Sequence, residues 1–188
     1  HMYGNTTVIT KAADRAAAVG ILVGNSAGNE GDGSWYYIGA PADGDSVFTI
    51  GAVDINGNSV SYSSHGPTFD GRLKPNVVGQ GAGTGVVASN GTVAYGNGTS
   101  YSSPLIAGAC ASFMSAFPEL SNMEVMDIIQ STASQADNPD NSMGYGIPNF
   151  AKAYLELKGI DISTENIISI LPNPASDEVT IFINGQET

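Results

Sequence analysis

Apolar positions in the first third of the chain switch between a helical spacing and unbroken runs. Between Thr7 and Val19, apolar side chains recur every three or four residues, and Gly20 follows as a helix stop. Residues 21–24 (ILVG) and 47–53 (VFTIGAV) are continuous apolar runs, which are typical of strands covered on both faces. The pattern predicts a helix followed by two interior strands, and therefore an α/β fold.

The rest of the chain predicts a hairpin, then helices. Short segments at 86–89 and 92–95 flank the turn dipeptide Asn90-Gly91, which is a hairpin signal. Three helices are then predicted, over residues 102–117, 121–134 and 149–157. The first is apolar around its whole circumference, so we expect it to run through the interior. Ser121 and Glu124 give the second a capping-box start.

The composition changes past Gly159, which predicts a domain boundary. We expect residues 3–160 to form the main domain, and residues 161–188 to form a linker with a short β segment at the C-terminus. The 188 residues are 41% apolar and only 13% charged, so Gly, Ser, Thr and Asn must cover much of the surface. Such a surface suits an exported protein.

Charge and hydropathy exclude several classes of function. A formal net charge of −12 repels phosphate backbones, so we expect no nucleic-acid partner. The longest uncharged run, residues 100–118, is too short and too interrupted by hydroxyls for a membrane span. Cys110 has no partner for an intrachain disulfide and is expected to be a buried thiol. We expect no signal peptide in these residues, because His1-Met2, which is typical of residues left by cloning, runs straight into a polar stretch.

Ser100 lies in the stretch NGTSYSSP, just before the predicted apolar helix. The first N–H groups of a helix are unpaired and carry the positive end of its dipole, so one of them can bind an oxyanion that develops beside the hydroxyl. Pro104 fits a first helical turn, where no N–H is needed. Spacing alone leaves two interpretations open: a nucleophile, or a serine that only caps the helix.

Asn29 lies in the loop GNSAGNEG, which directly follows the first predicted strand. Ligands of open α/β sheets bind beyond the carboxyl ends of the strands. Asn29 could offer its side-chain amide to an oxyanion, although an Asn between glycines is also an ordinary turn residue.

Together, these loops resemble the subtilase family. NGTSYSSPLIAG is similar to the family's nucleophile motif and AGNEG to its oxyanion motif, and SYSSHGPTFDGRLKPNVVGQG and IGAPADGDSVFTIGAV resemble the segments between them, in the family's order. The resemblance runs from about Val8 to Leu157. It implies a three-layer α/β fold with a mainly parallel sheet, of which this chain holds the C-terminal part.

The resemblance also implies a function, that of a serine endopeptidase acting on polypeptides. Ser100 would be the nucleophile, and its N–H would hold the oxyanion together with the Asn29 amide. Ala27, Gly28 and Gly39 would bind substrate, with Gly39 as the floor of the S1 pocket. The resemblance implies no required cofactor and no metal among these residues.

The chain departs from the family in its other catalytic residues. Family order places the catalytic Asp and His upstream of the oxyanion Asn, but His65 follows Asn29 and is expected to be a loop residue. Asp14 falls in a predicted helix and is expected to be solvated. We therefore expect this chain alone to be inactive, and to associate with a missing N-terminal half or with another copy through an exposed sheet edge. The alternative is a degenerate subtilase module used for binding or display.

Smaller features add three expectations. Asn76, Gly79 and Gln80 stand where the family commonly has Asp, Ala and Pro, which could reshape the strand end near Ser100. One loop carries side-chain oxygen atoms that could bind calcium, at Asp137, Asn138, Asp140 and Asn141. The alternative is an ordinary solvated loop. The tail LPNPASDEVTIFI resembles the start of a type IX secretion sorting domain, which implies a secreted or cell-surface bacterial protein; an ordinary hairpin is the alternative.

Overall fold

The computed structural model describes residues 2–160, 168–171, 180–183 and 186–187. It divides the chain into two compact units, residues 1–150 and 151–188. This division falls earlier than the predicted domain boundary at residue 160, which stays a prediction. The described part contains no helix that is both long and apolar enough to cross a membrane.

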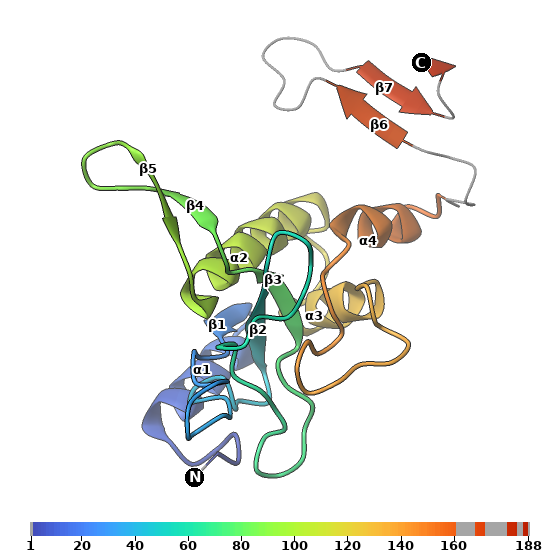
Figure 1. The fold of residues 1–188 in the computed structure, drawn as a ribbon. Coiled ribbons are helices and arrows are strands. Elements are labelled where there is room, and N and C mark those ends of the chain that lie inside the picture. The colour runs from blue at the N-terminus through green and yellow to red at the C-terminus, as the bar shows by residue number, and fades with distance from the viewer. Residues whose placement is uncertain (1, 161–167, 172–179, 184–185, 188) are drawn as a thin grey trace. The chain divides into compact units, whose positions relative to one another are not determined.

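A parallel sheet forms the centre of the first unit (Figure 1). Its strands are β1 (Val23–Ser26), β2 (Val47–Val53) and β3 (Val77–Gln80), in the order β1-β2-β3, and every residue of β2 is buried. Ser26 pairs with Ile50, and Ile50 pairs with Val77. The predicted α/β fold with a parallel sheet is confirmed, and the run predicted at residues 47–53 is β2.

The predicted first strand needs a correction. β1 begins at Val23 rather than Ile21, and none of its residues is fully buried. The reason is its position: β1 is an edge strand of the described sheet, so nothing pairs with its outer side. The preceding helix, α1 (Val8–Ala18), lies where it was predicted. It begins there because the Thr7 hydroxyl caps it by accepting from the N–H of Thr10.

The apolar helix needs two corrections. α2 (Thr99–Ala116) starts three residues before the predicted position, so Ser100 lies inside its first turn and Pro104 lies beyond it. α2 is also not buried all round: Ile106, Cys110 and Phe113 face inward, whereas Leu105 is 49% exposed. Within the described residues, the helix is covered mainly by the sheet, since it contacts all three strands.

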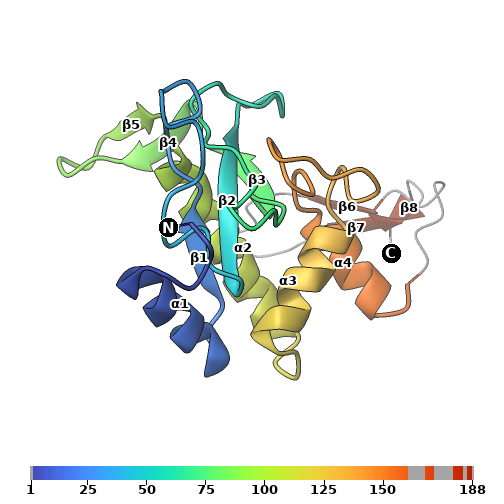
Figure 2. The same ribbon diagram turned by 90° about the horizontal axis from the view of Figure 1, so that it is seen from below.

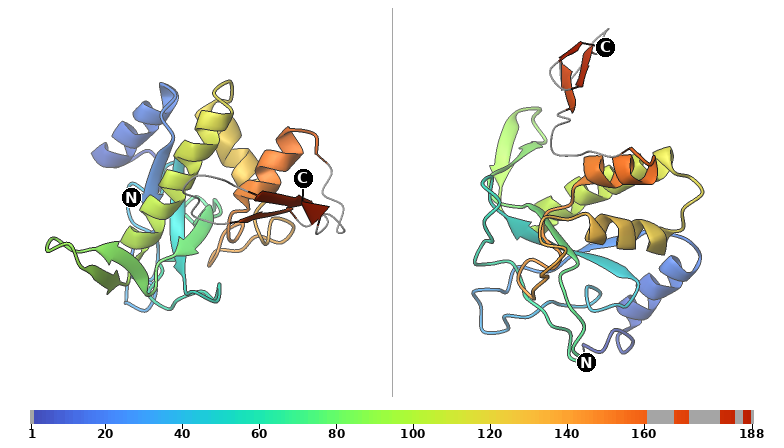
Figure 3. Two further views of the ribbon diagram at one scale, coloured as in Figure 1. Left: turned by 90° about the horizontal axis from the view of Figure 1, so that it is seen from above. Right: turned by 90° about the vertical axis from the view of Figure 1, so that its right-hand side faces the viewer.

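The remaining helices of the first unit complete three layers. α2 covers the sheet face that carries Phe48 and Ile50, and lies in front of the sheet in the left view of Figure 3 and behind it in Figure 2. Strand alternation puts Val47 on the opposite face, near the Asp14 carboxylate of α1. α3 (Asn122–Ser131) joins α1 there, because the Asn122 side chain donates to the carbonyls of Ala17 and Ile21.

Local signals placed the other elements well. The predicted capping box is present, since the Ser121 hydroxyl and the Glu124 carboxylate cap each other's backbone N–H. The predicted hairpin is the antiparallel pair β4 (Thr84–Val87) and β5 (Val93–Gly96).

The second unit contains most of α4 (Phe150–Leu157) and an antiparallel sheet. Its strands are β6 (Ile168–Leu171), β7 (Thr180–Ile183) and β8 (Gln186–Glu187). Most of the tail that resembles a sorting domain lies outside the described residues.

A buried amine links the first residue of β2 to the residue that precedes β3. Lys74 is 3% exposed, and its Nζ donates to the Val47 carbonyl at 2.6 Å and to Asn76 Oδ1 at 2.9 Å. A neutral amine has two N–H donors, and the structure supplies these two uncharged acceptors. Burial lowers the pKa of Lys74 to about 7, with a contribution from Arg72, while Asp45, Asp14 and Asp43 act in the opposite direction.

The depressed pKa of Lys74 predicts that stability rises with pH. In unfolded protein, a Lys titrates near pH 10.4, so between about pH 7 and 10 the folded state binds fewer protons than the unfolded state. The free energy of unfolding should therefore increase by up to about 1.4 kcal/mol per pH unit in this window. Urea unfolding midpoints at pH 7, 8 and 9 measure this increase.

Two variants isolate the contribution of Lys74. Lys74→Met should lose most of the increase, and Asn76→Asp should also lose it, because a carboxylate beside Nζ favours the charged amine. A Lys74→Met protein with the same pH dependence as the unaltered chain would show that Lys74 keeps an ordinary pKa.

Candidate active site

Ser100 is exposed in the first turn of α2, two residues after the glycine at the helix start. Gly98 caps the helix with φ of 144°, a conformation that residues with a side chain rarely adopt. A Cβ there would also lie 3.3 Å from the Asn29 amide nitrogen. Gly98 thus lets the Ser100 loop and the Asn29 loop meet closely.

The side chain of Asn29 is held by the residue before Ser100. Asn29 Oδ1 accepts from the Thr99 N–H at 2.8 Å and from the Thr99 hydroxyl at 3.0 Å. A backbone N–H can only donate, so the amide atom that faces it must be the oxygen. The Asn29 NH2 group is therefore turned away from Thr99. It is an exposed donor beside the helix start.

The three residues expected to bind substrate lie next to this pair. The N–H of Gly28 donates to the Thr99 hydroxyl at 3.2 Å, and the N–H of Gly39 donates to the Ala27 carbonyl at 3.4 Å. A Cβ at Gly39 would meet nothing within 4 Å, so open space lies beside it. The structure brings Ala27, Gly28 and Gly39 together with Thr99, although it does not test their roles.

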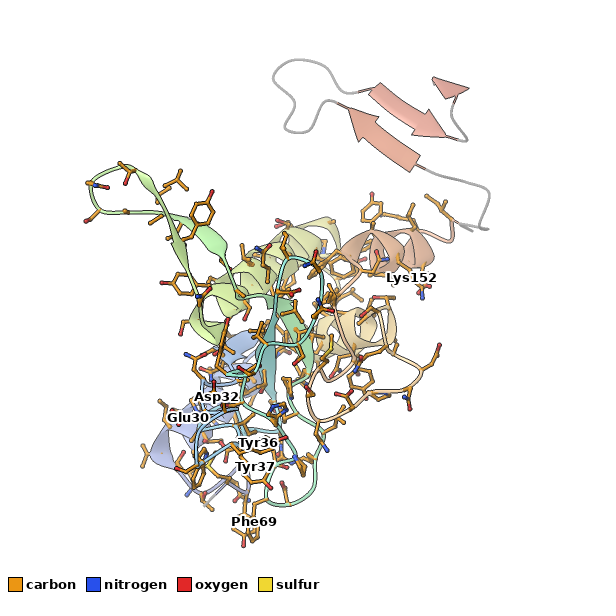
Figure 4. The ribbon with its side chains drawn as sticks, in the orientation of Figure 1. Glu30, Asp32, Tyr36, Tyr37, Phe69 and Lys152 are labelled. Carbon is orange, nitrogen blue, oxygen red and sulfur yellow. The ribbon has the colours of Figure 1, made fainter. Side chains whose placement is uncertain are left out.

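His65 and Asp14 have contacts that do not involve Ser100. The His65 ring stacks on Tyr36, with centroids 4.4 Å apart, and its backbone pairs with Tyr36 and Ile38. Figure 4 shows Tyr36 and Tyr37 in the loop that also carries Glu30 and Asp32. Asp14 was expected to be solvated, but it is half-buried and accepts from the N–H of Ser46 at 3.2 Å, because α1 packs against that loop.

The departures from the family pattern at Asn76, Gly79 and Gln80 each have a structural consequence. A Cβ at Gly79 would lie 3.0 Å from Ile106, so the glycine allows β3 to approach α2 closely. The Gln80 side chain donates to the Ala82 carbonyl at 3.3 Å, where the chain leaves β3. Asn76 accepts from the N–H of Thr49 at 2.8 Å and donates to Gln130 at 2.8 Å.

In the loop considered for calcium, a carboxylate oxygen of Asp140 is already hydrogen-bonded to the backbone of the same loop. Asp140 Oδ1 accepts from the N–H groups of Ser142 and Met143 at 2.8 Å and 2.7 Å, which closes a turn. Among the described residues, no three His, Cys, Asp or Glu side chains are grouped so that they could hold a metal ion. Calcium binding by this loop stays an untested expectation.

Sequence reasoning missed the residues that hold the site together. Thr99 is fully buried and bonds both Gly28 and Asn29, yet the motif singled out only its neighbour Ser100. A hydroxyl beside a helix start was a signal that could have identified it. Tyr62, which bonds the Gly81 carbonyl, and Ser64, which bonds the N–H of Glu30, were also missed, because these partners are distant in the sequence.

Comparison with known proteins gives one family. A sequence profile of the Subtilase family matches residues 2–146. Subtilisin DY of Bacillus licheniformis is 39% identical over 142 residues, which cover 75% of this chain and 48% of that protein. Subtilisin Savinase of Lederbergia lenta is 31% identical over 144 residues, which cover 77% of this chain and 50% of that protein. The chain thus spans half or less of the length of these relatives.

Solved structures show the same fold. The self-cleaved protease domain of PatA superimposes with a TM-score of 0.69 at 21% identity, covering 85% of this chain and 59% of that one. MycP1 of the ESX-1 type VII secretion system superimposes with a TM-score of 0.64 at 22% identity, covering 79% of this chain and 46% of that one.

Removal of the Thr99 hydroxyl should loosen the junction between the two loops. Thr99→Val keeps the shape of the side chain but leaves the Gly28 N–H without its acceptor, which should cost about 1–3 kcal/mol in the free energy of unfolding. Thr99→Ser keeps the hydroxyl and should cost less. Urea unfolding measures both, and equal losses would contradict the role of the hydroxyl.

Proposed function

The chain belongs to the subtilase family, and from this membership we propose that it is the Ser-bearing part of a serine endopeptidase. The observation that carries the proposal is the contact between Thr99 and Asn29. It turns the Asn29 NH2 away from Thr99, at the start of the helix whose first turn carries the exposed Ser100.

The chemistry follows from these groups. The Ser100 oxygen attacks the carbonyl carbon of a peptide bond and loses its proton to a base, while the carbonyl oxygen becomes an oxyanion. The Ser100 N–H and the Asn29 NH2 donate to that oxygen, and the positive end of the α2 dipole favours its charge. The acyl-enzyme forms as the amine leaves with a proton, and water then releases the acid and restores Ser100.

The substrate would be a polypeptide, bound by the residues beside the Ser100 loop. The open space at Gly39, next to buried Ala27, would receive the side chain that precedes the scissile bond. Because Gly39 has no side chain to fill this space, large apolar side chains should be favoured there.

We also propose that the base and its orienting Asp lie upstream, in a part of the protein that covers the outer side of β1. An apolar groove of about 300 Å³ lies between β1, β2 and α2, lined by residues that include Ile21, Ala107, Cys110 and Ala111. Burial raises the pKa of the Cys110 thiol to about 11. An edge strand beside an apolar groove is the arrangement expected where a further strand or helix packs.

Export is the third part of the proposal. The low content of charged residues, and the resemblance of residues 171–183 to a type IX sorting domain, support secretion to the exterior or surface of a bacterial cell. Catalysis would require no cofactor.

Fluorophosphonate labelling tests the nucleophile. In a longer form of the protein that includes the upstream Asp and His, the probe should label Ser100, and Ser100→Ala should abolish labelling. Asn29→Ala should lower kcat about 100- to 1,000-fold, the range known for subtilisin's own oxyanion Asn. This residue range alone should show no peptidase activity, since a serine without its base loses most of its rate.

Two results would contradict the assignment. An unlabelled Ser100 in the longer protein would favour the non-catalytic binding module. Cleavage by this residue range alone that disappears in His65→Ala would make His65 the base.

Substitution in the groove tests the upstream partner. Ala111→Arg places a charge against apolar side chains and should prevent co-purification of this chain with the separately expressed upstream segment. Ser131→Arg, at an exposed position of α3, is the matched control and should bind normally. Equal binding by both variants would show that the groove is not the contact.

A further inference from the structure

We propose that residues 62–64 form a bracket that holds the two halves of the oxyanion site in register, with Tyr62 and Ser64 as positioning residues. Each of the three side chains bonds a different part of the fold. The inference deepens the proposed function and rests on it, because it concerns residues that act through Asn29 and the Ser100 loop.

Tyr62 holds the Ser100 side of the site. Its hydroxyl donates to the Gly81 carbonyl at 2.8 Å, and the same carbonyl accepts from the N–H of Gly98 at 2.8 Å. Gly98 is the cap of α2, two residues before Ser100. Burial raises the pKa of the Tyr62 hydroxyl, although a backbone contact with Gly98 opposes the shift, so the hydroxyl stays a protonated donor at neutral pH.

Ser64 holds the Asn29 side. Its fully buried hydroxyl accepts from the N–H of Glu30 at 3.0 Å, and its own N–H donates to the Gly28 carbonyl at 3.0 Å. The Tyr62 carbonyl accepts from the N–H of Gly31 at 2.9 Å. The backbone is therefore fixed on both sides of Asn29.

Ser63 ties the bracket to the core. Its fully buried hydroxyl accepts from the N–H of Ala52 at 3.0 Å, and Ala52 belongs to the buried strand β2. The Asn29 loop and the Ser100 loop are thus both connected, through residues 62–64, to the same buried strand. This matters for catalysis, because an oxyanion donor is effective only when it is already in place, and a displacement of about 1 Å can cost about 100-fold in rate.

Single variants in the longer protein test the bracket by kinetics. Ser64→Ala and Tyr62→Phe each remove one side-chain hydrogen bond and should lower kcat about tenfold, with KM nearly unchanged, because the oxyanion exists only in the transition state. The matched control is Ser61→Ala, since within the described residues the exposed Ser61 hydroxyl bonds only Asp32, at 3.3 Å. It should keep full activity.

A double-mutant cycle separates positioning from a general structural effect. If Ser64 acts through Asn29, Ser64→Ala should lower kcat less than twofold in an Asn29→Ala background. A tenfold loss in both backgrounds would overturn the positioning role. The fraction of protein labelled by the fluorophosphonate probe corrects each rate for misfolded protein.

Amide hydrogen exchange distinguishes failure of the bracket from failure of the proposed function. Ser64→Ala should speed exchange at Glu30 at least tenfold, and Tyr62→Phe should do the same at Gly98, whether or not the protein cleaves peptides. Unchanged exchange at both amides would overturn the bracket even in an active protease. An unlabelled Ser100 with faster exchange would support the bracket and reject only the protease function.

Discussion

The two hydrogen bonds from Thr99 to the side-chain oxygen of Asn29 are the interactions on which the site depends. They join loops 70 positions apart in the sequence, at 2.8 Å and 3.0 Å. One donor is a backbone N–H, so the bonds also decide which end of the amide faces outward. Without them, Asn29 would be an exposed turn residue with two equivalent orientations, and no donor would be fixed beside Ser100.

The parallel sheet explains why these loops can meet. β2 is buried at every position and pairs in parallel with β1 and β3. The chain therefore leaves β1 and β3 on the same side of the sheet, at the carboxyl ends of the strands. The segment after β1 reaches Asn29, and the segment after β3 leads through the hairpin to Ser100. α2 then crosses all three strands, which anchors the end that carries Ser100.

The same core tolerates an unusual polar pair. Lys74 and Asn76 are both buried, and the partner of the amine is a neutral amide where the family commonly has a carboxylate. Burial makes a charged amine costly there, and this lowers the pKa of Lys74 to about 7 although three nearby carboxylates act in the opposite direction. The Lys74 amine and the Asn29 side chain thus both bond uncharged backbone or amide groups.

The sequence by itself determined the elements whose signals are local. The apolar run of β2, the capping box of Ser121 and Glu124 and the turn at Asn90-Gly91 each depend on neighbouring residues, and each was predicted at its observed place. The motifs also singled out Ser100 and Asn29 as candidates. Only the tertiary structure decided that β1 is a half-exposed edge strand, that α2 has an exposed side, and that Thr99, Tyr62 and Ser64 hold the loops. The physical reason is that burial and long-range hydrogen bonds depend on which distant segments meet, and periodicity along the chain carries no record of that.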